Sequence, residues 1–351
     1  MSNDNLKTSR ILWIDSVKFF GILAIVLGHT ILGGWLKHYV YSFHVPLFFF
    51  MMGVTSSLTK FDSKPFFQYV KKQAYSLLVP YYIFAVISTA IIFFVSLFVD
   101  FDEAKIFDEP VKLFTQILTG YCRANNPLWF LPCAFVMCTI AYLIVRSVNN
   151  IKASKVRIFI FVCIATAFGI LMYLNYHYIG IHRIFYKTDS ALELLPFFLM
   201  GYCFFEYNVS KKIESLNAYI KVPLAIALIV LGAILGSINK EAAYLSSIYG
   251  NIAVFYLSAI LSILGIIILC MTLRPLKLLT YCGARTITIL LLHKFPILAF
   301  QRVIPFTSAY LENYSVPVGV AVALISIAVC CVIDVLIMRI APFMIGKRKV
   351  K

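Results

Sequence analysis

The chain has 351 residues, of which 62% are hydrophobic and only 13% are charged, and its mean hydropathy is +0.90. A soluble domain carries about twice that charged fraction, so this composition excludes a soluble globular protein. The formal net charge of +16 does not indicate nucleic-acid binding, because the basic residues are divided among short loops between long apolar runs. The sequence therefore predicts an all-α fold, a polytopic transmembrane helical bundle.

Apolar runs of about 20 residues, the length that crosses a bilayer as a helix, recur along the whole chain. They predict about ten spans, at residues 12–33, 41–59, 73–99, 127–146, 157–176, 190–207, 222–238, 251–273, 286–305 and 316–342. No loop between them is long enough for a soluble domain, so we expect residues 1–351 to form a single integral-membrane domain. The first run contains charged residues and no cleavage pattern follows it, so we expect no cleavable signal peptide.

The loops between the spans differ in charge. Most of the 31 lysines and arginines lie in one set of alternate loops, which also includes the two ends of the chain. The positive-inside rule then predicts that both termini are cytoplasmic. The acidic loop at residues 100–109 falls on the opposite, extracytoplasmic side, and an even number of spans agrees with two termini on one side.

The first predicted span contains three residues that are costly inside a bilayer, Asp15, Lys18 and His29. Eleven residues, close to three helical turns, separate Lys18 from His29, so both lie on one face about 16 Å apart. Ile22 and Ile25 lie between them on the same face. Asp15 is too far from His29 to orient it, at about 21 Å along the helix, and we expect it to pair with Lys18 at i,i+3.

The second predicted span begins with the run Tyr41-Ser42-Phe43-His44-Val45-Pro46. The turn between the first two spans is short, so they form an antiparallel hairpin. His29 and His44 then lie near the same end of this hairpin and could share one depth and one pocket. Pro46 frees a backbone carbonyl beside His44, which is tolerated at membrane depth where the backbone lines a cavity.

Further candidate residues lie between or within the later spans. Lys71 and Lys72 precede the third span on the predicted cytoplasmic side, where they could attract phosphates. The candidates near the predicted outer ends of spans are Arg123, Trp129, Glu193 and His293. The nine cysteines form neither a metal-binding cluster nor a disulfide framework, so no metal is expected.

Several of these motifs together resemble a known family. The pattern Asp15-x-x-Lys18-x10-His29 is similar to the basic-residue-x10-His signature of the membrane acyltransferase family 3, which comprises bacterial integral-membrane O-acyltransferases that modify cell-surface sugars. Further blocks resemble family motifs in the same order, at residues 43–49, 71–81, 127–131, 195–202 and 289–293. Many members have arginine where this chain has Lys18, whereas the fucose 4-O-acetylase-like subgroup commonly has lysine.

The resemblance implies transfer of an acyl group from acyl-CoA to a sugar hydroxyl, and it favours acetyl as that group. A hydroxyl is a poor nucleophile until a positioned base takes its proton, and His29 is the candidate base. The resemblance assigns the other candidates by role: His44 as a second catalytic residue; Lys18, Asp15, Lys71 and Lys72 for the donor; and Trp129, Arg123, Glu193 and His293 on the acceptor side. Acetyl-CoA, or another acyl-CoA, would be a co-substrate, with no bound cofactor.

The implied acceptor is a surface polysaccharide, O-antigen, capsule or lipid-linked intermediate, and the implied location is the bacterial inner membrane, among membrane lipids. Each residue also has a structural alternative. His29 could be a structural histidine bound to the carbonyl of a neighbouring helix, His44 could also be structural, and His293 could simply pack against the first span. Lys18 could snorkel to the interface, Lys71 and Lys72 could only set topology, and Trp129 could belong to an aromatic belt. A transporter or flippase for a glycan is the alternative function, because intramembrane Asp, Lys and His also serve proton relays.

Overall fold

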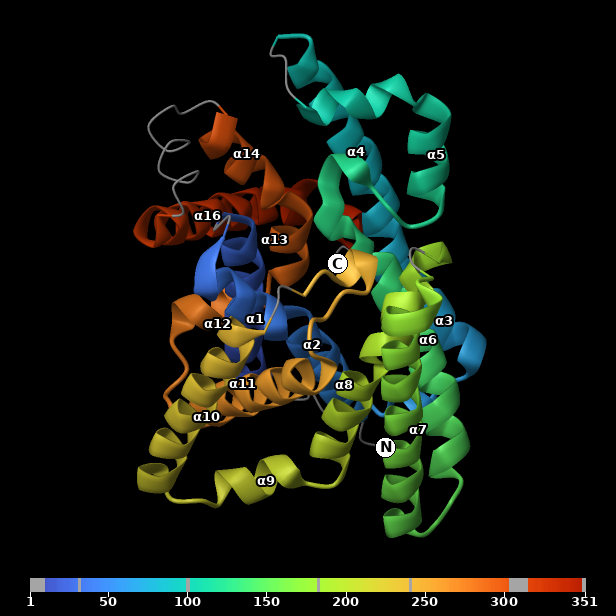
Figure 1. The fold of residues 1–351 in the computed structure, drawn as a ribbon, viewed down its shortest axis with the longest axis vertical. Helices are drawn as coiled ribbons and strands as arrows, with labels where there is room; N and C mark the ends of the chain where they lie inside the picture. Colours follow the sequence, from blue (N-terminus) through green and yellow to red (C-terminus); the bar gives the residue numbers. More distant parts are fainter. Residues whose placement is uncertain are drawn as a thin grey trace, which may run out of the picture.

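The computed structural model describes residues 10–30, 33–98, 102–181, 184–239, 242–302 and 315–348 (Figure 1). The first half of the chain forms α1 (Leu12–Thr30), α2 (Gly34–Leu58), α3 (Phe66–Gln73), α4 (Val79–Ser96), α5 (Pro110–Leu118), α6 (Phe130–Asn149) and α7 (Ser154–Leu174). The second half forms α8 (Thr188–Glu206), α9 (Val209–Glu214), α10 (Ala218–Ile238), α11 (Ile252–Thr272), α12 (Lys277–Gly283), α13 (Thr286–Leu292), α14 (Lys294–Arg302) and α16 (Val316–Ile340). Within the described ranges an isolated bridge between Ala243 and Ile248 is the only β pairing. The predicted all-helical fold is confirmed.

Eight helical stretches in these ranges are long and apolar enough to cross a membrane. A ninth is obtained if α12 and the helical residues 286–301 count as one broken span, bent by 63° at the break. The remaining predicted span, 190–207, is α8, which carries Asp189, Glu193 and Glu206 and is largely buried. The protein is therefore a multi-pass membrane protein whose number of spans is near the predicted ten.

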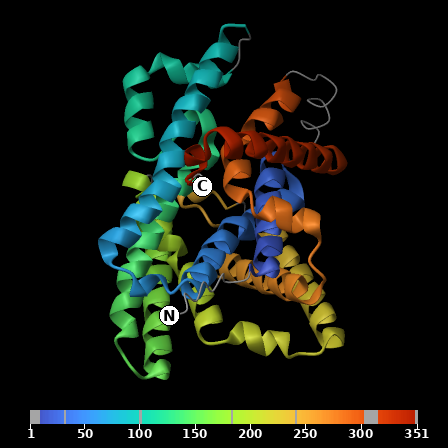
Figure 2. The ribbon, with the colours of Figure 1, turned by 180° about the vertical axis from the view of Figure 1, so that it is seen from behind.

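Helix α2 lies in the middle of the bundle, where it contacts α1, α8, α10 and α11 (Figure 1 and Figure 2). Glycines allow α2 and α8 to pack backbone against backbone. A Cβ atom at Gly53 would lie 2.0 Å from the Phe198 carbonyl oxygen, and one at Gly201 would lie 1.9 Å from the Phe50 carbonyl oxygen. In lipid, helices associate without a hydrophobic driving force, and small residues at the contact allow their backbones to approach closely.

The break between α12 and α13 is held by a buried acid on α16. The Asp334 carboxylate forms an ion pair with Arg285 at 2.9 Å and accepts a hydrogen bond from the Thr288 hydroxyl. Arg285 lies in the break itself, and Thr288 lies in the first turn of α13. The sequence analysis did not single out Asp334, although a lone acid within an apolar span is a signal for such a contact.

Three short segments that are not regular α-helix contribute residues to the candidate site. Residues Ala74–Leu78 form a π-helical turn, η2, between α3 and α4. Residues Arg123–Trp129 form a 3-10 segment, η4, before α6, and residues Tyr244–Ser246 form η7 in the loop between α10 and α11. Turns of the π type are often found at functional sites, so the position of η2 is relevant to function.

Candidate functional site

An apolar cavity with an open volume of about 680 Å³ lies along the middle of α1. Lys18, Ile22 and Ile25 line it together, so the structure places the predicted face of α1 toward this cavity. The opposite walls come from α2, α6 and α13. Among the described residues that line the cavity, Lys18 alone is charged, and its ammonium is the feature that can attract an anionic or strongly polarised group there.

Asp15 has a different partner from the one that the spacing predicts. Its buried carboxylate is bound by the Arg10 guanidinium, which lies just before α1, and not by Lys18. The planar guanidinium, reaching in from outside the helix, suits a carboxylate better than an ammonium on the same helix does. The expected Asp15–Lys18 pair is therefore wrong, and Lys18 is left facing the cavity.

His29, near the end of α1, lies against His293. Their ring centroids are 5.2 Å apart, with the two rings tilted by 42°. His293 follows directly after α13 and is fully buried. The sequence analysis assigned the two residues separate roles and kept packing of His293 against the first span as its structural alternative. It could not name His29 as the contact, because residues so far apart in the chain give no signal of which side chains meet.

His44 lies in an aromatic environment on α2. Its Nδ1 lies 2.6 Å from the Val40 carbonyl oxygen. Its ring is nearly perpendicular to those of Tyr41 and Tyr244, with ring centroids 5.0 Å and 5.6 Å away. Trp129 stacks on Tyr244, with ring centroids 6.3 Å apart. The structure thus brings His44 and Trp129 together through Tyr244, a loop residue that the sequence analysis missed.

Tyr244 also ties its loop to α2. Its hydroxyl donates a hydrogen bond to the Tyr41 carbonyl oxygen, and its ring is buried. Burial raises the pKa of this phenol well above its usual range, so the hydroxyl stays protonated and remains a donor. The α10–α11 loop is thereby held against the start of α2.

Arg123, at the start of η4, lies in a more exposed environment. Its guanidinium is 3.5 Å from the Glu109 carboxylate, which also accepts hydrogen bonds from Lys112. The Lys112 hydrogen bonds, with the charges of Lys112 and Arg123, lower the pKa of Glu109. Arg123 is about one third exposed and remains accessible to a polar ligand.

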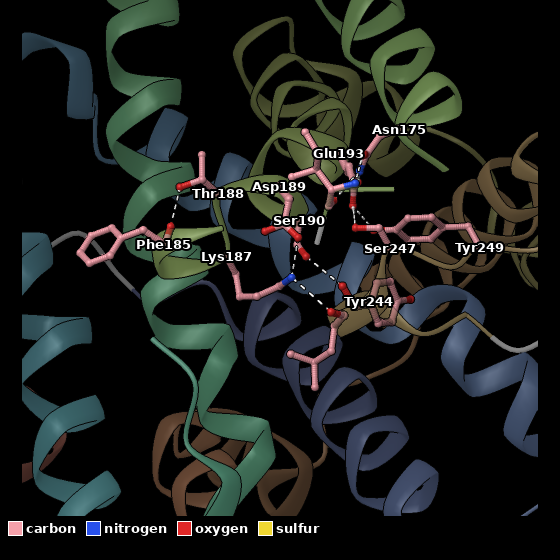
Figure 3. Close-up of polar contacts among 12 residues, drawn as sticks. Asn175, Phe185, Lys187, Thr188, Asp189, Ser190, Glu193, Tyr244, Ser247 and Tyr249 are labelled. Atoms are coloured by element: carbon pink, nitrogen blue, oxygen red, sulfur yellow. Dashed lines mark hydrogen bonds and ion pairs between the residues drawn. The ribbon is translucent and has the colours of Figure 1, made fainter. Parts of the chain in front are cut away.

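Glu193 on α8 is buried, and its carboxylate is surrounded by hydrogen-bond donors, as Figure 3 shows. One oxygen accepts from Asn175 at 2.9 Å, and the other accepts from Ser247 at 2.9 Å and Tyr249 at 2.6 Å. Burial, followed by the nearby Glu193 charge, raises the pKa of the Tyr249 phenol, which keeps this donor protonated. These contacts fix the α10–α11 loop and the end of α7 onto α8.

A second anchor holds the same loop beside Glu193 (Figure 3). The Lys187 ammonium lies 2.6 Å from the Asp189 carboxylate and 3.3 Å from the Leu245 carbonyl oxygen, with both charged side chains buried. The Ser190 hydroxyl donates to the Tyr244 carbonyl oxygen at 2.9 Å. The start of α8 therefore determines where Tyr244 meets His44.

Lys71 and Lys72 line a basic cavity with an open volume of about 1240 Å³. Lys64 and Arg348 add two more cations, and Tyr75 and Ser76 of η2 complete part of the wall. The next residue of η2, Leu77, lines the apolar cavity that contains Lys18. The π-helical turn is therefore a shared wall between a cavity suited to phosphates and a cavity suited to an apolar chain.

No group of three or more His, Cys, Asp or Glu side chains within the described ranges is arranged to hold a metal ion. The model of a protein family described as an acyltransferase domain matches residues 11–335 of the chain. No curated protein and no solved structure matches it. The matched range contains every candidate residue from Asp15 to His293, together with the apolar cavity.

Proposed function

The chain belongs to the acyltransferase 3 family, and we propose on this basis that it transfers an acetyl group from acetyl-CoA to a hydroxyl of a cell-surface or lipid-linked sugar. Family membership makes the protein a membrane acyltransferase. The choice of acetyl-CoA, the sugar acceptor and the roles of individual residues are our inferences from the two cavities and the histidines.

The proposal rests on one observation: the segment η2 lines two cavities, the basic one through Tyr75 and Ser76 and the apolar one through Leu77. Acyl-CoA combines a phosphorylated nucleotide with a long, narrow arm that ends in the thioester. The four cations around the basic cavity suit the phosphates, because Lys and Arg bind phosphate oxygens through strong, charge-assisted hydrogen bonds. The arm would pass Leu77 into the apolar cavity, where Lys18 faces the donor.

His29 is the proposed general base. Helical rise places it about 16 Å beyond Lys18 on the same helix, away from the basic cavity. It would take the proton of the acceptor hydroxyl while the oxygen attacks the thioester carbonyl carbon. The carbon–sulfur bond breaks as the new ester forms, and the departing thiolate takes up the proton from His29 to give free CoA.

The acceptor would approach near His29 from the side of η4 and the α10–α11 loop. Trp129 and His44 are the proposed acceptor-side support, with His44 held through Tyr244. Arg123 is accessible for a polar contact, whereas the Glu193 carboxylate is already bound by three donors. We therefore assign Glu193 to fixing the loop and not to contacting the sugar.

Three further points belong to the proposal. The basic cavity faces the cytoplasm, where acyl-CoA is made, so both termini are cytoplasmic and the acceptor side is extracytoplasmic. Lys18 at the signature position favours a fucose 4-O-acetylase-like specificity. The protein would act as one domain in the bacterial inner membrane.

The direct test is the reaction of the purified full-length protein in detergent with acetyl-CoA. Thiol release is measured together with transfer of isotope-labelled acetyl to a panel of hexoses and 6-deoxyhexoses. We expect release of CoA that is stimulated by one or more of these sugars, together with a labelled sugar ester. Complete absence of both thiol release and ester formation, with acetyl-CoA and succinyl-CoA alike, would contradict the proposed activity.

A further inference from the structure

The orientation of the His293 ring is fixed by the end of α13. Helix α13 ends at Leu292, and the backbone N–H of His293 donates to the Ile289 carbonyl oxygen at 2.9 Å. The His293 Nδ1 lies 2.9 Å from the Ile289 carbonyl oxygen and 3.0 Å from that of Leu290. Carbonyl oxygens only accept hydrogen bonds, so Nδ1 carries the proton of the neutral ring.

The other nitrogen of His293 is then an acceptor. In a neutral imidazole with the proton on Nδ1, the Nε2 atom has a free lone pair. This atom is buried and has no hydrogen-bond partner among the described residues. A buried acceptor without a partner is destabilising, so a donor is expected to meet it in the working protein.

His29 is placed to supply that donor. Its ring centroid lies 5.2 Å from that of His293, and the planes of the two rings are tilted by 42°. We infer that His293 is a positioning residue, whose Nε2 lone pair accepts the N–H of His29 and so directs the other, unprotonated nitrogen of His29 toward the acceptor hydroxyl. This inference rests on the proposed function, because it specifies how the base is oriented.

A second element keeps the arrangement rigid. The Asn125 amide of η4 donates to the Leu291 carbonyl oxygen at 2.9 Å and to the Ser88 hydroxyl at 3.2 Å. Both Asn125 and Ser88 are fully buried. The last turn of α13 is thus held by α4 and η4, and His293 cannot turn away from His29 without losing its own two carbonyl contacts.

The arrangement accounts for the path of the proton. Before reaction, the N–H of His29 is donated to His293, and the remaining nitrogen of His29 holds the lone pair. When that lone pair takes the acceptor proton, His29 becomes an imidazolium, and its hydrogen bond to His293 strengthens because the donor is now charged. The same proton then passes to the departing thiolate, and His293 neither gains nor loses a proton.

The first test is spectroscopic and uses the unmodified protein. In full-length protein labelled with ¹⁵N-histidine, the nitrogen shifts of His293 report which nitrogen carries the proton, and His29→Gln and His293→Gln identify the two residues. We expect His293 to be protonated at Nδ1 and unprotonated at Nε2, with an Nε2 shift that moves in His29→Gln. Protonation of His293 at Nε2 would overturn the inference.

The second test separates positioning from acceptor binding by kinetics. In the thiol-release and transfer assay, His293→Phe keeps the ring volume but has no acceptor, whereas His293→Gln retains an oxygen that can accept. We expect His293→Phe to lower kcat by about tenfold or more, with the KM for acetyl-CoA unchanged. The loss should not exceed the whole contribution of a general base, which is typically 10²–10⁴-fold. His293→Gln should recover part of the loss. A raised KM for the sugar with unchanged kcat would make His293 an acceptor contact instead.

A double-mutant cycle distinguishes failure of this inference from failure of the proposed function. If His293 acts through His29, adding His293→Phe to His29→Gln costs nothing further. His44→Phe is the matched control, because it also removes a buried imidazole held by a carbonyl four residues earlier; its cost should persist in the His29→Gln background. Full activity of His29→Gln would contradict the proposed base, whereas a strongly reduced but measurable activity of His29→Gln, lowered further by His293→Phe by the same factor as in the parent, would contradict only the positioning role.

Discussion

Gly283 on α12 packs directly against the backbone of Asp15 on α1: a Cβ atom at position 283 would lie 1.8 Å from the Asp15 carbonyl oxygen. This contact sets how closely the broken span α12–α13 approaches α1. Since α13 provides one wall of the apolar cavity and leads to His293, the separation of these helices determines the shape of the candidate site.

The first prediction is that Gly283→Ala lowers stability. The added methyl group meets backbone and not a flexible side chain, so the helices must separate, at a typical cost of about 1–3 kcal/mol. Gly169→Ala on α7 is the control, because the nearest atom to its Cβ would be 3.9 Å away. Thermal unfolding in detergent should show a lower midpoint for Gly283→Ala alone, and equal midpoints for both variants would contradict the close contact.

The second prediction concerns His29. Glutamine keeps a hydrogen-bonding side chain but does not accept a proton at neutral pH, so His29→Gln should lose about 10²–10⁴-fold in turnover. We expect the unfolding midpoint to stay close to that of the parent protein. Acetyl transfer is compared at equal protein concentration and saturating acetyl-CoA. Turnover near the parental level would exclude His29 as the base and leave His44 or His293 as the next candidate.

The third prediction concerns Lys18. Because Arg10 binds Asp15, the Lys18 ammonium is available to the donor, and Lys18→Ala should weaken acetyl-CoA binding more than Lys18→Arg does. Arginine keeps the charge but needs more room in the cavity and has a different geometry. Calorimetric titration of acetyl-CoA into each variant measures the effect. Unchanged affinity in Lys18→Ala would leave Lys18 with an interfacial role only.

The fourth prediction concerns the basic cavity. Replacing Lys71 and Lys72 together by alanine should raise the KM for acetyl-CoA by roughly tenfold, since each charged hydrogen bond contributes about 1.5–3 kcal/mol before screening by solvent and salt. The KM for acetyl-pantetheine, which has no nucleotide phosphates, should not change. The matched control is the pair Lys211 and Lys212 on α9, which lies outside this cavity.

An equal rise in KM for both donors would mean that the lysines do not bind the nucleotide. A rise in KM for acetyl-CoA when Lys211 and Lys212 are replaced would instead indicate a general effect of surface charge. The effect of replacing Lys71 and Lys72 should also diminish as the salt concentration increases.

The fifth prediction concerns topology. A reporter inserted near Asn150, between α6 and α7, should be cytoplasmic, and one near Asp108, before α5, should be extracytoplasmic. The positive-inside distribution of lysine and arginine is the physical reason. Accessibility of both sites to membrane-impermeant reagents in intact cells provides the measurement. The reverse pattern would place the basic cavity outside and remove the proposed cytoplasmic route for acyl-CoA.

Much of the fold follows from local sequence. The length of the apolar runs predicts helices that cross the membrane, because a buried backbone in lipid must form its hydrogen bonds within the helix. Helical periodicity likewise places Lys18, Ile22 and Ile25 on one face, and all three line the apolar cavity. The sequence also predicted a helix at 190–207, which is α8, but α8 with its three acids is not among the described helices that are apolar enough to cross a membrane.

The sequence by itself thus determined the helical membrane fold and the shared face of α1, because both depend on residues a few positions apart. Only the tertiary structure decided which side chains meet: Asp15 with Arg10, His29 with His293, and Glu193 with donors from α7 and the α10–α11 loop. These contacts depend on the crossing of helices and on loops, whose geometry is set by packing and not by periodicity. For the same reason, the shared wall at η2 could not be predicted from the residues that form it.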